Sequence, residues 1–238
     1  MPTVPTAKEM ASNLASLSNL LCKEELINPK SKNSLDAACG KLRKLGQVQS
    51  YRYTIDSVAP IKFVPIGSKK LKQIAPHVYI DVAINPPTKD DLPPFSQLVT
   101  VIEVWDVLKN DLQLRWHLDL ANRSDEGHYQ AGPLFHLQAG GHQPKGNRKD
   151  DLKVSIPRWE MPPKELILAC EMILANFYPD KWNKIKRQQR WLELIQFAQS
   201  LCYPMYFQRV QNSLERQQSV LEALWATEWG TTGLSQKT

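Results

Sequence analysis

The apolar residues of this chain change their spacing twice, and this change limits the fold more than any other feature. Apolar side chains recur at helical intervals over residues 1–47, alternate over residues 50–142 and return to helical intervals over residues 160–229. Strands grouped between two sets of helices are typical of an α+β fold. We therefore predict a single α+β domain over residues 1–238: an antiparallel β-meander of about five or six strands, with an N-terminal helical hairpin and C-terminal helices packed on one sheet face.

Start and stop signals place the predicted helices. Thr6 and Glu9 fit a capping box at the start of the first helix. Pro29 breaks the pattern, and a second helix is expected from about Ser34, with Gly46 just after its end. The C-terminal region predicts a buried helix from Pro162 and Pro163 to about Asn176, another over about 186–201, and an amphipathic helix over 207–229 with exposed Trp225 and Trp229.

Alternating residues predict the strands. Proline-rich connections such as Asn85-Pro86-Pro87 cannot continue a ladder, so they separate one strand from the next. The expected strands cover residues 51–55, 61–66, 78–84, 99–107, 112–120 and 133–139.

Several features point to a soluble, cytoplasmic protein. The chain has no run of about 18 or more apolar residues that would predict a membrane span. The first ten residues, MPTVPTAKEM, lack the basic and apolar segments of a secretory signal. The cysteines are widely spaced on apolar helical stripes, which indicates free, buried thiols in a reducing compartment. They are Cys22, Cys39, Cys170 and Cys202.

Four of the five histidines lie in one segment, from His117 to His142. Strand alternation places His117 and Asp119 on the face opposite Trp116 and the leucines that follow it. In the next strand, His136 and Gln138 share a face in the same way. If the apolar faces of the two strands coincide, these four polar side chains lie together. The sequence therefore predicts two imidazoles and a carboxylate side by side.

Two chemistries fit that cluster. Two histidines and one carboxylate are a common ligand set for a divalent metal. Alternatively, one histidine acts as base and the other as acid in a metal-free cleavage of a phosphodiester. The candidate catalytic residues are His117, Asp119 and His136; the candidate phosphate-binding residues are Arg115, Lys145, Arg148 and Arg158; Gln138 and His142 are candidate neighbours. The same pattern also suits a half-exposed strand with no site at all.

Basic residues suggest which partners suit the chain. Its net charge of +6, from 30 Lys and Arg against 24 Asp and Glu, permits an anionic partner. Cations interleaved with aromatic rings are typical of a nucleic-acid surface, such as RNA or DNA binding requires, although a solvated helix face has the same pattern. Such clusters occur at Lys69–Lys72, Lys145–Arg158 and Lys181–Arg190. No P-loop, GxGxxG or GxSxG motif is present.

The order of helix, strands, a GPLFH segment ending at His136 and a WEMPP step from Trp159 resembles that of ubiquitin-conjugating folds. Such a resemblance implies a reactive cysteine after the histidine. The next cysteine is Cys170, inside a helix predicted to be buried, and conjugation needs an accessible thiolate. Conjugating activity is therefore not predicted.

Two functions remain open from the sequence. The first is a protein that contacts nucleic acid or another phosphorylated partner, with a hydrolytic site at His117, Asp119 and His136. The second is a non-catalytic interaction module or scaffold subunit, which binds protein partners through its open sheet face and the 207–229 helix.

Overall fold

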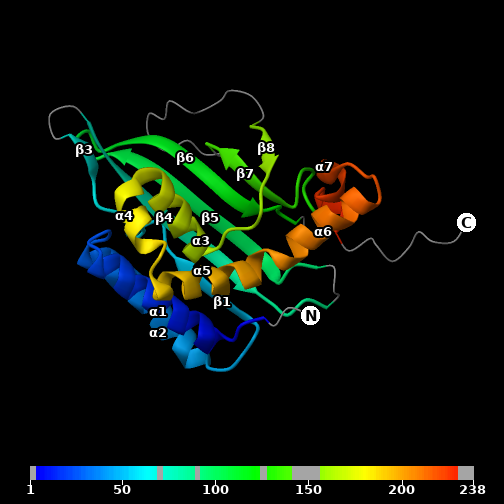
Figure 1. The fold of residues 1–238 in the computed structure, drawn as a ribbon, viewed down its shortest axis with the longest axis horizontal. Helices are drawn as coiled ribbons and strands as arrows, with labels where there is room; N and C mark the ends of the chain where they lie inside the picture. The colour runs from blue at the N-terminus through cyan, green and yellow to red at the C-terminus, as the bar shows by residue number, and fades with distance from the viewer. Residues whose placement is uncertain (1–3, 69–71, 89–91, 124–127, 141–155, 230–238) are drawn as a thin grey trace, which may run out of the picture.

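The computed structural model describes residues 4–68, 72–88, 92–123, 128–140 and 156–229. Within these ranges the chain forms seven α-helices and one antiparallel sheet of eight strands. Figure 1 shows the helices of the N-terminal hairpin and of the C-terminal region against the sheet. The α+β architecture predicted from hydrophobic spacing is therefore confirmed.

The N-terminal hairpin consists of α1 (Ala7–Lys23) and α2 (Pro29–Leu45). Thr6 and Glu9 form the predicted capping box, in which each side chain binds the backbone of the other residue. The second helix begins earlier than Ser34, because the side chain of Asn28 accepts a hydrogen bond from the backbone of Ser31 at 2.9 Å. Pro29 is therefore the first helical residue, where its missing N–H removes no helical hydrogen bond.

The sheet has the order β1-β4-β5-β6-β7-β8, and β2 and β3 also pair with β4. The expected strand over 61–66 is divided into two short strands, and β8 is a strand that the sequence did not indicate. The three short strands β1, β2 and β3 follow one another along β4, while β5 to β8 extend the sheet from it. The strands are β1 (Tyr51–Ile55), β2 (Ile61–Lys62), β3 (Ile66–Ser68), β4 (Lys72–Ile84), β5 (Phe95–Asp106), β6 (Asp111–Leu120), β7 (Phe135–Ala139) and β8 (Arg158–Glu160).

The C-terminal helices differ most from expectation. The helix expected over 207–229 is interrupted at Gln217, whose φ of 54° is left-handed and does not continue a helix. Trp229 is buried rather than exposed, with its ring edge-on to Phe135 at 5.9 Å, so it is not a surface anchor. The helices are α3 (Leu166–Phe177), α4 (Pro179–Ile185), α5 (Gln189–Cys202), α6 (Pro204–Glu215) and α7 (Val220–Ala223), followed by a 3₁₀ turn over Ala226–Glu228.

The two faces of the sheet have different chemistry. One face packs against the helices: Thr100 donates a hydrogen bond to the carbonyl before α3, and Tyr53 donates to the buried Glu165. The buried apolar residues of the helices and of this face form one connected core. The alternate residues of β4 to β8 make up the opposite face, which we call the polar face. Its members include His77, Tyr79, Asp81, Glu103, Arg115, His117, Asp119, His136, Gln138 and Arg158.

The four cysteines are free thiols, as predicted. Cys170 has no exposed surface, and its burial raises the pKa of the thiol, so it cannot supply the accessible thiolate of a conjugating enzyme. Among the residues that the structure describes, no helix has the length and apolar character that a membrane crossing requires.

Candidate functional site

The pairing of β6 with β7 positions the candidate catalytic residues. His117 lies opposite Gln138, and Asp119 lies opposite His136. Directly paired residues of antiparallel strands project from the same face of a sheet. The four side chains therefore share the polar face, in agreement with the placement expected from strand alternation.

His117 and Asp119 interact directly. His117 Nδ1 lies 3.3 Å from Asp119 Oδ2, and the two side chains are 22% and 19% exposed. A proton on Nδ1 is donated to this carboxylate, which leaves Nε2 as the basic atom of the neutral ring. His117 Nε2 and Asp119 Oδ1 are both buried and have no hydrogen-bond partner in the structure that is described. Buried polar atoms normally have a hydrogen-bond partner, so a ligand could form hydrogen bonds with these two atoms.

His136 is held in a similar way by a backbone acceptor. Its Nδ1 lies 3.3 Å from the carbonyl oxygen of Pro133, and the residue is only 5% exposed. Burial lowers the pKa of the His136 imidazole; Asp119 opposes this effect, while Arg158 and His117 add to it. His136 is therefore neutral near pH 7, with Nε2 available to accept a proton.

Arg115 is committed to an internal ion pair. Its Nε and one terminal nitrogen donate to Glu103 Oε1 at 2.9 and 2.5 Å, and both residues are buried. Trp105 Nε1 donates to the other oxygen of the same carboxylate at 2.9 Å. This arrangement does not favour the predicted phosphate-binding role of Arg115, because its guanidinium group already binds Glu103 on the neighbouring strand.

Arg158 is the candidate cation that lies beside the cluster. It pairs with Gln138 in the sheet, and its guanidinium group donates to the carbonyl oxygen of Ala131 at 2.9 Å. The remaining candidates, Lys145, Arg148 and His142, lie outside the described residues. Of the other basic clusters, Lys181–Arg190 lies in α4, in the turn that follows it and at the start of α5, all within the helical layer.

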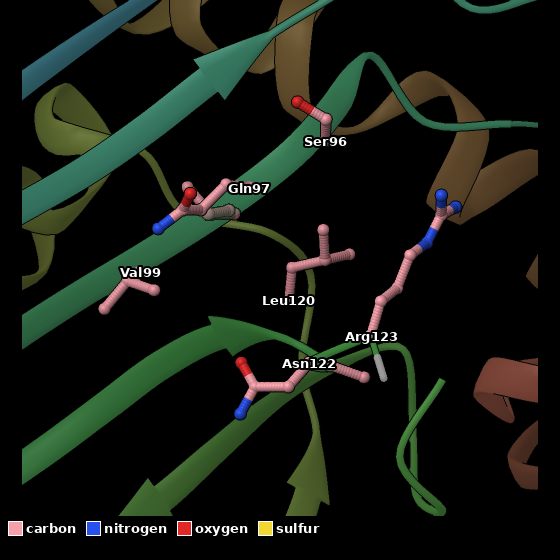
Figure 2. Close-up of a pocket in the computed structure, with 8 residues that line it drawn as sticks. Ser96, Gln97, Val99, Leu120, Asn122 and Arg123 are labelled. Carbon is pink, nitrogen blue, oxygen red and sulfur yellow. The ribbon is translucent and has the colours of Figure 1, made fainter. Parts of the chain in front are cut away.

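A pocket adjoins the cluster where two strands separate. The β5–β6 ladder ends at the pair Val99 and Asp119. Beyond this pair lies a pocket of about 310 Å³ lined by Ser96, Gln97, Leu98, Val99, Leu120, Ala121, Asn122 and Arg123. Figure 2 shows Gln97, Asn122 and Arg123 around this gap, which we call the strand pocket.

The sequence did not reveal the residues of the strand pocket. Ser96 and Gln97 precede the expected strand, and Asn122 and Arg123 follow one, so all four resembled ordinary loop residues. The signal that could have found them is the polar Asn-Arg step directly after a strand that carries histidine. Its meaning depends on the separation of β5 from β6, which a single strand's pattern does not contain.

The geometry does not favour a metal site at the cluster. Among the described residues, no group of three or more His, Cys, Asp or Glu side chains is placed to hold a metal ion. The two imidazoles have their Nδ1 atoms held by separate protein acceptors, which leaves Nε2 as the reactive atom of each ring. This arrangement suits proton transfer through the Nε2 atoms.

No protein-family model matches this chain, and no curated protein or solved structure is significantly similar to it. A function therefore has to be inferred from the chemistry of its own residues.

Proposed function

We propose that this chain contacts nucleic acid at the polar face and cleaves a phosphodiester bond there by metal-free acid–base chemistry. One observation carries the proposal: two imidazoles from neighbouring strands share one face, and each has its Nδ1 held by an acceptor. Such rings are oriented to transfer protons at Nε2. The unpartnered Nε2 of His117 is the atom most in need of a ligand.

The two histidines have different roles, one as base and the other as acid. His136, kept neutral by burial, accepts the proton of the attacking hydroxyl group. His117, whose Nδ1 is held by Asp119, acts as the acid and, when protonated, donates a proton from Nε2 to the leaving oxygen. The strand pocket beside Asp119 gives the substrate room, and Arg123 at its edge supplies a cation for the phosphate.

The test is RNA cleavage by His117→Ala and His136→Ala. Each substitution is expected to lower the cleavage rate by about 10²–10⁴-fold, because each removes one proton-transfer group. The melting temperature of His117→Ala should remain nearly unchanged, whereas His136→Ala, at a buried position, should lower it. A large loss of stability in both variants, or unchanged cleavage in either, contradicts the proposal.

A matched control comes from His77 on the same face. Its ring stacks on Trp105 with centroids 5.7 Å apart, so His77→Phe retains an aromatic ring and removes only the imidazole nitrogens. Cleavage by His77→Phe should equal that of the unmodified protein.

The pH dependence of cleavage gives a further check. Because the pKa of His136 lies below its ordinary value of 6.5, the rate should begin to fall only at a pH more acidic than 6.5.

A protein-interaction module is the second candidate. It is favoured by an apolar pocket of about 340 Å³ on the helical side of the sheet, lined by Ile102, Trp116, Leu137, Met172, Ile173, Asn176 and Phe177. Trp159, 62% exposed, is the sheet partner of Leu137. Binding measured at two salt concentrations distinguishes the two proposed functions, because affinity for nucleic acid falls steeply with added salt. Self-association that Trp159→Ser weakens, without salt-sensitive oligonucleotide binding, favours the module.

A further inference from the structure

Two pockets meet at Arg123. The first is the strand pocket, whose other polar side chains are Ser96, Gln97 and Asn122. The second, of about 280 Å³, is lined by Arg123, His128, Tyr129, Ala226, Thr227 and Trp229, and we call it the aromatic pocket. One cation therefore borders a pocket of mixed polar and apolar lining on one side and a pocket with two aromatic rings on the other.

The aromatic pocket has a pre-arranged wall. The guanidinium carbon of Arg123 lies 4.3 Å from the centre of the Tyr129 ring, and the Tyr129 hydroxyl accepts a hydrogen bond from the same group. The backbones of these two residues also form an isolated antiparallel bridge. Tyr129 and Arg123 are thus stacked before any ligand arrives, which lowers the entropy cost of binding a flat ring.

Trp229 forms a rigid boundary of the same pocket. Its Nε1 donates to the carbonyl oxygen of Leu224 at 3.3 Å, and Arg209 lies over its ring at 4.6 Å. These contacts hold the indole in one orientation. Aromatic rings beside stacked guanidinium groups are the surface that an unpaired nucleobase recognises.

We propose that the two pockets bind adjacent parts of one single-stranded nucleotide chain. An unstacked base occupies the aromatic pocket against Tyr129, and its phosphate lies at Arg123. The next sugar and phosphate occupy the strand pocket. This inference rests on the proposed nucleic-acid contact and adds its substrate class, single-stranded rather than duplex, because a paired base cannot enter a stacking pocket.

The position of the pockets gives the proposal a direction. The strand pocket includes Val99, the sheet partner of Asp119. A strand that runs from the aromatic pocket past Arg123 therefore reaches the His117–Asp119 pair. The bound base fixes which phosphodiester lies next to the catalytic cluster.

The experiment compares two oligomers of equal length and charge. One is a short single-stranded oligodeoxynucleotide, and the other is an abasic oligomer with the same number of phosphates. Both are titrated against the full chain at one salt concentration, under conditions in which the probes remain intact. The normal oligomer should bind about 5- to 150-fold more tightly, as expected for stacking of one base.

Variants separate the contribution of the base from that of the phosphate. Tyr129→Leu should remove most of the preference for bases and leave the abasic affinity unchanged. Tyr129→Phe, which retains the ring, should keep the preference, and the unchanged abasic affinity of Tyr129→Leu would show that this variant is folded. Arg123→Ala should weaken both oligomers. Arg43→Ala, which removes an exposed arginine of α2 outside the basic clusters, should change neither.

The outcomes distinguish this inference from the catalytic proposal. Equal binding of the two oligomers, or a preference that persists in Tyr129→Leu, overturns the inference even if His117-dependent cleavage is found. Base-dependent binding through Tyr129 with no cleavage supports the inference and overturns the catalytic proposal alone.

Discussion

Glu165 is a carboxylic acid that is fully buried in the core. Its carboxyl group has no exposed surface and caps α3, accepting hydrogen bonds from the backbones of Ile167 and Leu168 at 2.9 and 3.2 Å. Tyr53 donates to its other oxygen at 3.2 Å. Burial outweighs these bonds and raises the pKa of Glu165 to about 7. The residue therefore changes charge near neutral pH inside the core.

This raised pKa makes the stability of the protein depend on pH. The folded pKa of about 7 lies above the ordinary value of 4.5, so the folded state binds the proton more tightly than the unfolded state. The resulting stabilisation is complete below about pH 4.5 and is lost as pH rises through 7. Glu165→Gln should abolish this loss, which amounts to about 3 kcal/mol. Urea unfolding at pH 5 and pH 8 measures it.

The control for Glu165 is Glu222→Gln, an exposed residue of α7. It should leave the difference in unfolding free energy between the two pH values as it is in the unmodified protein. If Glu165→Gln loses as much stability between pH 5 and pH 8 as the unmodified protein does, the buried carboxyl is not the group responsible.

At the scale of elements, prediction succeeded where each strand or helix carries its own signal. The alternation around His117 gave both its strand and its face, and the Thr6–Glu9 capping box gave the start of α1. β8 was missed because three residues are too few for a period. The break at Gln217 was missed because neither glycine nor proline marks it.

The start of α2 gives a prediction at this scale. Asn28→Ala removes the oxygen that accepts from the Ser31 backbone and should cost about 1 kcal/mol of stability, measured by chemical unfolding. Asn33→Ala is the matched control, because Asn33 is exposed within the same helix and alanine is the better helix former. That variant should be neutral or slightly more stable. Equal destabilisation by both would mean that the Asn28 side chain does not cap α2.

At the scale of the molecule, the sheet separates two environments. Its helical face holds the connected apolar core, and its opposite face holds an ion pair and the histidine cluster. The sequence predicted this division from strand alternation. It could not predict the two pockets at Arg123. The strand pocket depends on the separation of β5 from β6, and the aromatic pocket depends on Arg123 and Trp229, more than one hundred residues apart, meeting in space.

Thiol reactivity tests the layering of the whole molecule. Cys39, Cys170 and Cys202 are buried, and burial raises the pKa of each thiol, whereas Cys22 is only half-buried. A thiol reagent should therefore modify one cysteine rapidly in the native protein and all four in denaturant. Cys22→Ser should remove the rapid phase. If more than one cysteine reacts rapidly in the native protein, the helices are packed less tightly than in this structure.

The separation of β5 from β6 after Val99 and Asp119 has a mechanical consequence. β6 continues to pair with β7 beyond the point where its ladder with β5 has ended. In the part of the chain that is described, the β5–β6 ladder has no pair beyond Val99 and Asp119, and Phe95 packs edge-on against Phe135 across the separated strands, with ring centroids 6.3 Å apart. Asp119 lies where the two strands separate and is paired in both ladders, so a molecule that enters the strand pocket meets a carboxylate whose position relative to His136 is fixed by the sheet.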